Sequence, residues 1–176
     1  MSKLKLKDLL NEAFETVGGI VTTKPIHNLD GSFSSKQTIT EGTRWNVGIE
    51  EPNGKVTAVY GHYDGYPQWV GKILKSSYSN SSKVKLLLKL GKQGISTLDK
   101  SMKGGKDHSF DSPKKGETVF YGRDRGEKGN MTMKYKNIDE FGEDFQQKYG
   151  AEYGYIWSVK NKKWTMFDYR GNKKEL

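Results

Sequence analysis

Apolar and polar residues alternate along two neighbouring segments of the chain, residues 44–50 and 55–62. In the first segment Trp45, Val47 and Ile49 share one side, as in a half-buried strand. Residues 52–54 (Pro-Asn-Gly) lie between the segments and are typical of a turn. The pattern therefore predicts a β-hairpin at the start of the folded body.

Further along, apolar residues recur every three or four positions, which indicates two α-helices. The first is expected from Pro67, which suits a first helical turn, to about residue 77. The second is expected from about residue 82 to Gly91, because glycine commonly ends a helix. The apolar positions of these two helices are Trp69, Val70, Ile73, Leu74, Tyr78, Val84, Leu87 and Leu88.

The rest of the body begins with residues 104–116, which lack periodicity and are typical of an exposed loop. The elements expected after it are a strand at residues 117–123, a helix at 138–149 capped by Asn137, and a hairpin of residues 152–160 and 163–169. This order predicts an α+β domain over residues 43–176. We expect a mainly antiparallel sheet of about five strands, with helices packed on one face.

Residues 1–42 form a separate region that precedes this domain. Residues 2–17 have the apolar spacing of a short amphipathic helix, and the residues up to 42 have the composition of a polar linker. Two interpretations stay open, because this helix can dock on a partner or pack on the body as ordinary core. The docking residues would be Leu6, Leu9, Leu10 and Phe14.

Composition narrows the function classes. The chain has no cysteine, which excludes disulfides, thiolate nucleophiles and cysteine-based zinc sites. Its net charge is +9, and between residues 72 and 116 eleven lysines face three aspartates. Such a stretch attracts phosphate-rich partners, although a solubilising lysine surface is the alternative interpretation. Scarce arginine disfavours sequence-specific reading of DNA. The expected basic patch consists of Lys72, Lys75, Lys83, Lys85 and Lys89.

The densest group of reactive side chains lies in residues 61–67 (GHYDGYP), between a predicted strand and a predicted helix. Such corners expose side chains and unpaired backbone N–H groups together. Residues 121–127 (YGRDRGE) contain the paired arginines of a second polar segment. If the two segments are neighbours, together they suit a phosphate or a nucleotide. The expected ligand-binding residues are His62, Asp64, Tyr66, Arg123 and Arg125.

These residues also have plainer interpretations. Asp64 precedes a glycine and is a common turn-former, and the two arginines can form local salt bridges that shape a loop. No nucleophile or cofactor loop accompanies His62, and the three histidines of the chain match no usual zinc spacing. We therefore expect no catalytic residue, no metal site and no cofactor.

Three separated motifs carry a resemblance to known proteins. They are residues 44–49 (RWNVGI), 62–67 (HYDGYP) and 121–127 (YGRDRGE), followed by a hairpin rich in tyrosine and tryptophan. In this order they resemble a family of uncharacterised proteins encoded by tailed bacteriophages, over about residues 43–168. The resemblance implies a phage origin and no particular mechanism. Residues 1–13 are similar to short leaders on some proteins of large tailed phages, which implies a capsid or host protein as partner.

The leading hypothesis is a phage-encoded accessory protein, a non-catalytic module that binds nucleic acid or a nucleotide. A virion-associated or partner-docking protein is the second hypothesis. The third is a small metal-dependent hydrolase of nucleotides or nucleic acid, with His62 as base and Asp64 as orienting residue or metal ligand. No apolar run approaches the roughly 20 residues of a membrane span, so no membrane partner is expected. The expected location is the host cytoplasm, or the virion.

Overall fold

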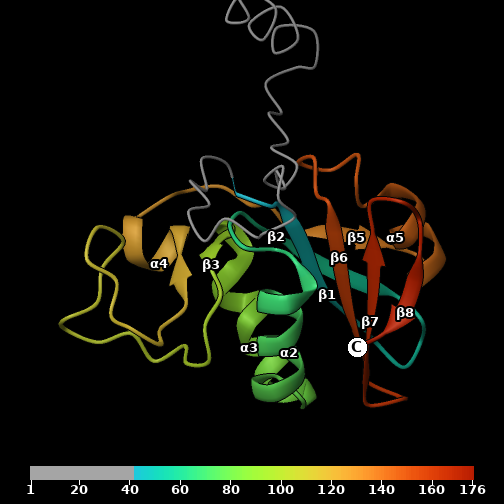
Figure 1. The fold of residues 1–176 in the computed structure, drawn as a ribbon, viewed down its shortest axis with the longest axis horizontal. Helices are drawn as coiled ribbons and strands as arrows, with labels where there is room; N and C mark the ends of the chain where they lie inside the picture. The colour runs from blue at the N-terminus through green and yellow to red at the C-terminus, as the bar shows by residue number, and fades with distance from the viewer. Residues whose placement is uncertain (1–41) are drawn as a thin grey trace, which may run out of the picture. The chain divides into compact units, whose positions relative to one another are not determined.

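Eight strands form one sheet in a computed structural model that describes residues 42–176 (Figure 1). The strands are β1 (Trp45–Glu50), β2 (Val56–Gly61), β3 (Ile95–Thr97), β4 (Val119–Phe120), β5 (Met133–Tyr135), β6 (Tyr153–Ser158), β7 (Lys163–Asp168) and β8 (Lys173–Glu175). The helical elements are η1 (Pro67–Gly71), α2 (Lys72–Ser77), α3 (Ser81–Leu90), η2 (Gly91–Gln93), α4 (Tyr121–Arg125) and α5 (Ile138–Asp144). The predicted docking helix with Leu6, Leu9, Leu10 and Phe14 lies outside the described residues.

The sheet is mixed, with the strand order β4-β3-β2-β1-β6-β7-β8 and with β5 also paired to β2. Both predicted hairpins are confirmed, since β1 pairs antiparallel with β2 and β6 pairs antiparallel with β7. However, β6 lies parallel to β1, and β3 lies parallel to β2. The expectation of about five mainly antiparallel strands is therefore wrong, although helices and strands do combine in one domain as the α+β class requires.

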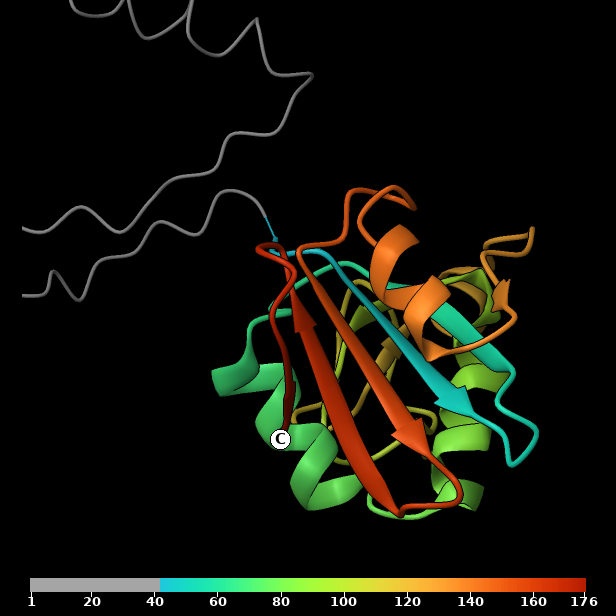
Figure 2. The same ribbon diagram turned by 90° about the vertical axis from the view of Figure 1, so that its right-hand side faces the viewer.

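Helices cover both faces of the sheet. On one face α2 and α3 pack on a core that includes Val47, Val59 and Trp157. On the other face α5 places Phe141 and Phe145 on a second core cluster. In Figure 2 the strands β1, β6 and β7 run between α2 and α5. The expectation that all helices pack on one face is thus wrong, because alternate residues of the central strands are apolar on both sides.

Local sequence explains where the longer helices begin. The side chain of Asn80 accepts a hydrogen bond from the Lys83 backbone N–H at 2.8 Å, and α3 starts directly after it. Asn137 accepts from the Glu140 N–H at 2.8 Å, which confirms its predicted role as the cap of α5. Both are side-chain caps of free N–H groups in a first helical turn.

The expected strand at residues 117–123 is mostly wrong. Only Val119–Phe120 is strand, and Tyr121–Arg125 is the short helix α4. The Asp124 carboxylate accepts a hydrogen bond from the Phe120 N–H at 2.8 Å, which favours a helical turn at this point. Gly126 ends the turn in a left-handed conformation with φ of 78°. Among residues 42–176, no helix is long and apolar enough to cross a membrane.

Candidate nucleic-acid interface

The corner after β2 is held by backbone hydrogen bonds on two sides. The N–H of His62 donates to the Ile95 carbonyl at 2.9 Å, and the N–H of Tyr63 donates to the Ser96 carbonyl at 3.0 Å. The N–H of Gly65 donates to Thr43 at 2.9 Å. The corner therefore continues along β3 in a fixed position, and side chains on it are oriented by the sheet.

His62 lies among aromatic side chains. Its Nδ1 is 2.6 Å from the Tyr121 hydroxyl oxygen, and its ring stacks on Tyr63 with the centroids 4.0 Å apart and the planes at 4°. Burial lowers the pKa of His62 below its usual 6.5, and the positive charge of Arg44 lowers it further. The imidazole is therefore neutral at pH 7.

Asp64 and Tyr66 form a separate pair at the turn. The Tyr66 hydroxyl lies 3.5 Å from the Asp64 carboxylate, and Asp64 itself has a φ of 60°. Burial raises the pKa of Asp64, and the Tyr66 hydroxyl lowers it in part. In the described part of the chain, no hydrogen bond joins Asp64 to His62. Its left-handed backbone suits the turn-forming interpretation, because aspartate tolerates this conformation better than most residues.

A continuous series of aromatic rings extends from His62 in both directions, and we call it the aromatic row. Tyr60 lies 5.9 Å from His62, and Tyr149 lies 5.2 Å from Tyr60, measured between ring centroids. On the other side, Phe110 lies 5.5 Å from Tyr121. The row consists of Tyr149, Tyr60, His62, Tyr63, Tyr121 and Phe110. Tyr149 is 42% exposed and Tyr63 is 38% exposed, so two of the rings offer open surface.

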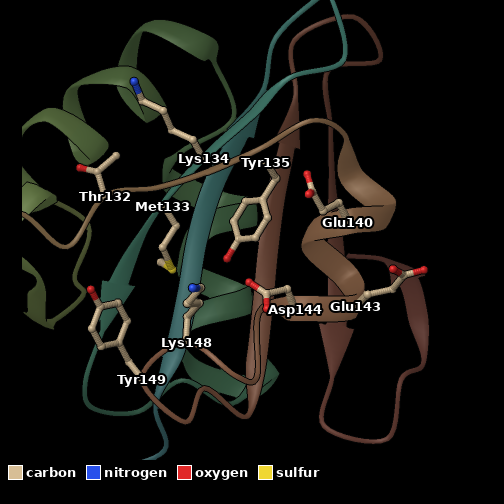
Figure 3. Close-up of a pocket in the computed structure, with 9 residues that line it drawn as sticks. All are labelled: Thr132, Met133, Lys134, Tyr135, Glu140, Glu143, Asp144, Lys148 and Tyr149. Atoms are coloured by element: carbon tan, nitrogen blue, oxygen red, sulfur yellow. The ribbon is translucent and has the colours of Figure 1, made fainter.

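A hollow of about 270 Å³ opens beside the row, where β2 changes partner. The first half of β2 pairs with β5 as far as Ala58, and its last residue, Gly61, pairs with β3. Tyr60 falls between the two pairings and lines the hollow together with Tyr121, Lys128 and Met131. A second, larger pocket is lined by Tyr149 and by residues of β5 and α5 (Figure 3). Tyr60 lines the smaller cavity and Tyr149 lines the larger one, so the contact between these two rings lies between the cavities.

Arg123 does not reach His62, whose hydrogen-bonding partner is Tyr121. The Arg123 guanidinium donates to the carbonyls of Met102 at 2.7 Å and Thr118 at 2.9 Å. It also donates to the Asp124 carboxylate at 2.6 and 2.9 Å. Its donors are therefore used to hold the loop of residues 102–118 against α4, which matches the local salt-bridge interpretation.

Asp124 is the centre of this loop-holding cluster. Its side chain is nearly buried, and it accepts hydrogen bonds from Arg123 and from the Phe120 N–H. Burial raises its pKa, but these hydrogen bonds outweigh burial and hold the pKa below the usual range. The Nδ1 of His108 accepts from the Lys114 N–H at 3.1 Å, so its Nε2 carries the hydrogen that points to Asp124 at 3.2 Å. The Asp124 carboxylate, the Arg123 guanidinium, the His108 imidazole and the Phe120 N–H therefore all have hydrogen-bonding partners within the domain.

Arg125 and the predicted lysine patch lie apart from each other. Arg125 is 53% exposed at its side chain, and its guanidinium lies 4.8 Å over the Phe110 ring at one end of the aromatic row. The patch of Lys72, Lys75, Lys83, Lys85 and Lys89 lies on α2 and α3, which cover the other face of the sheet from Tyr60. Lys85 pairs there with Glu51 at 3.0 Å. The structure therefore places His62 beside Tyr121, whereas Arg125 lies at the Phe110 end of the row and the lysine patch lies on the other face of the sheet.

The row residues missed from the sequence are Tyr60, Tyr63, Phe110, Tyr121 and Tyr149. Their signal was the number of tyrosines, 10 in the chain, at positions that did not all fit a core stripe. Within residues 42–176, no group of three or more His, Cys, Asp or Glu side chains could hold a metal ion. No protein-family model matches the chain, and neither curated proteins nor solved structures give a match.

Proposed function

We propose that this domain binds single-stranded nucleic acid by stacking unpaired bases on the aromatic row. The observation that carries the proposal is the row itself, which exposes Tyr149 and Tyr63 at the surface of a basic domain. Stacking on aromatic side chains is the usual way in which proteins hold unpaired bases, because every base has a flat π-face. The row and the hollow beside it offer such faces around the end of β2.

Single strands fit this surface better than duplexes. Ring centroids along the row are 4.0–6.2 Å apart. These rings can stack on the faces of unpaired bases, whereas the faces of paired bases inside a duplex are already covered by their neighbours. Reading a duplex in its major groove relies on paired arginine contacts to base edges. Arg123 has its donors bound within the domain, which leaves Arg125, over Phe110, and Arg44, whose charge acts on His62 and Tyr60, as arginines at the row.

The charge supports an anionic ligand. The acidic and basic residues of the first 41 positions balance, so the +9 of the chain belongs to residues 42–176. Lys128 lines the smaller hollow, and the charge of Arg44 acts on His62. These side chains and Arg125 supply positive charge for phosphates while the rings hold bases. The phage origin and the capsid or host partner of the N-terminal helix stay predictions, and a virion location rests on them.

The test is fluorescence anisotropy with a labelled 12-nucleotide single strand of mixed sequence. We expect Tyr149→Ala and Tyr63→Ala each to weaken binding by about 1 kcal/mol or more, which is about fivefold in the dissociation constant. Tyr169→Ala is the matched control, because Tyr169 is 49% exposed and lies at the turn after β7, away from the row. Its binding should equal that of the parent.

Salt dependence separates this proposal from non-specific attraction. For a single strand, the logarithm of the binding constant falls with the logarithm of salt concentration, with a slope of about −0.7 per phosphate contacted. We expect Arg125→Ala to reduce this slope and the two tyrosine variants to leave it unchanged. Equal binding by Tyr149→Ala, Tyr63→Ala and the parent would show that the row is not the site. Absence of binding at low salt would end the proposal.

A further inference from the structure

A tryptophan side chain lies exposed on the helical turn that follows the corner after β2. Trp69 belongs to η1 and is 44% exposed, whereas the other three tryptophans of the chain are 0–4% exposed. The sequence pattern predicts Trp69 in the buried stripe of this helix, but the stripe is filled by Val70, Ile73 and Leu74 instead. A large aromatic ring is therefore available at the surface, and tryptophan is among the residues that most often dominate binding interfaces.

Two lysines share the outer side of this helical segment with Trp69. Lys72 and Lys75 follow at intervals of three residues, and both are exposed, whereas the core positions between them are buried. Neither ammonium group has an ion-pair partner among residues 42–176. We call Trp69, Lys72 and Lys75 the tryptophan face. Figure 2 shows η1 and α2, which carry it, as the green helical segment to the left of the sheet.

The sequence around the tryptophan face is basic. Residues 65–98 contain six lysines and no aspartate or glutamate. Among the lysines of α2 and α3, Lys85 is the one that forms an ion pair within the described residues, with Glu51. The tryptophan face therefore lies in a positive field, which attracts an anionic partner.

A flat ring beside free ammonium groups fits a single-stranded nucleic acid. Unpaired bases stack on aromatic side chains, while lysines attract the phosphates of the backbone. A duplex would offer phosphates to the two lysines, but the faces of its paired bases are covered and could not stack on Trp69. The chemistry of the tryptophan face is thus the same as that of the aromatic row.

The tryptophan face also continues the aromatic row along the chain. Tyr63 is the exposed ring of the row at the corner, and Trp69 follows six residues later, with its N–H donating to the Tyr66 carbonyl at 3.1 Å. Six residues span at most about 22 Å. A 12-nucleotide strand with a rise of about 3.4 Å per nucleotide is about 40 Å long, so one strand can contact both surfaces.

We propose that a single strand bound on the aromatic row also crosses the tryptophan face, with one base stacked on Trp69 and phosphates at Lys72 and Lys75. This inference rests on the proposed function and extends its binding surface from the corner to α2. It also gives two lysines of the predicted basic patch a role in binding.

Tryptophan emission reports this contact directly, because Trp69 is the exposed tryptophan of the chain. Full-length protein is titrated with the labelled 12-nucleotide strand, and emission is recorded together with anisotropy. We expect emission to fall in parallel with binding, since a stacked base quenches the indole. Trp69→Phe should lose this change in emission and keep its affinity within about twofold, because phenylalanine still stacks. Trp69→Ala should weaken binding about fivefold or more.

Salt dependence tests the two lysines. Lys72→Gln/Lys75→Gln should reduce the slope of the logarithm of the binding constant against the logarithm of salt concentration by about 1.4, or about 0.7 per phosphate contact. Lys55→Gln/Lys160→Gln is the matched control, because these exposed lysines lie in the β1–β2 and β6–β7 turns, at the other end of β2 from the corner. The control should keep the slope of the parent.

Three results would overturn the tryptophan face while stacking on the row stands. They are parent affinity in Trp69→Ala, a change in emission that persists in Trp69→Phe, and an unchanged salt slope in Lys72→Gln/Lys75→Gln. If no strand binds to the parent protein, both proposals are wrong. Urea unfolding of each variant shows whether the fold is retained.

Discussion

Arg123 and Arg125 are two residues apart on α4, and the structure gives them different roles. The Arg123 guanidinium donates to Met102 and Thr118 carbonyls and to the Asp124 carboxylate, while its side chain is 25% exposed. Arg125 contacts Glu127 at 3.5 Å and lies over Phe110, with 53% of its side chain exposed. Replacing each by alanine therefore tests the assignment of one arginine to the fold and the other to the ligand.

The two substitutions should differ several-fold in their effect on stability. Removing one partner of a buried ion pair costs about 3–5 kcal/mol, because the other charge stays buried without a partner. Since Arg123 is partly exposed, water can reach Asp124 in the variant, and we expect a loss of about 2–4 kcal/mol. The exposed ion pair of Arg125 and its contact with an aromatic ring are each worth about 1 kcal/mol or less.

Urea unfolding followed by tryptophan fluorescence gives both free energies of unfolding, and anisotropy with a single strand gives binding by the folded fraction. Arg123→Ala should lower stability and leave the affinity of folded protein within about twofold of the parent, whereas Arg125→Ala should weaken binding with little loss of stability. The reasoning fails if Arg123→Ala is as stable as the parent. It also fails if the folded Arg123→Ala protein loses more affinity than Arg125→Ala does.

Three further outcomes follow from the same contacts. The pKa of Asp124 is lowered in the folded protein, so its carboxylate stabilises the fold above about pH 3.8, and this contribution is lost as the pH falls through the folded pKa. The difference in the free energy of unfolding between Asp124→Asn and the parent should therefore shrink when urea unfolding is repeated at decreasing pH. Gly61→Ala would place its methyl 2.1 Å from the buried Trp45 ring and should cost more than about 2 kcal/mol in urea, whereas Gly71→Ala, with 3.3 Å, should cost less. Tyr135→Phe removes an unsatisfied hydroxyl and should not lower the melting temperature.

The hydrophobic pattern was sufficient to predict those secondary-structure elements that are long and have clear ends. The two hairpins and α3 were predicted because alternation or helical spacing persists over six or more residues. The missed strands β3, β5 and β8 have three residues each, which is too short for a period to be recognised. The pairing of β3 and β5 also depends on β2, which lies more than 30 positions earlier in the chain. The parallel contact of β6 with β1 joins residues about 100 positions apart, and no local pattern carries that information.

The candidate site was predictable only in part, for the same reason. His62 was recognised from its corner, but its partner was expected to be an arginine on a strand. Because Tyr121 begins a helix, its hydroxyl meets His62 and the following arginine turns toward the loop instead. Tyr149 was assigned to a helix stripe, yet α5 ends at Asp144 and the ring packs on Tyr60. Each error follows from an element boundary, which sequence patterns determine poorly.

The position of the aromatic row follows from the pairing of β2, which contacts two different strands along the same edge. Its pairing with β5 stops at Ala58 and its pairing with β3 involves Gly61, so Tyr60 lies where the two partners diverge. Side chains from four segments line the opening there, and backbone hydrogen bonds hold the corner beside it. A ligand on this surface would meet rings that are already in place, since they stand on strands and packed turns. Little side-chain entropy would then be lost on binding, and that preorganisation favours affinity even for a contact area of only a few bases.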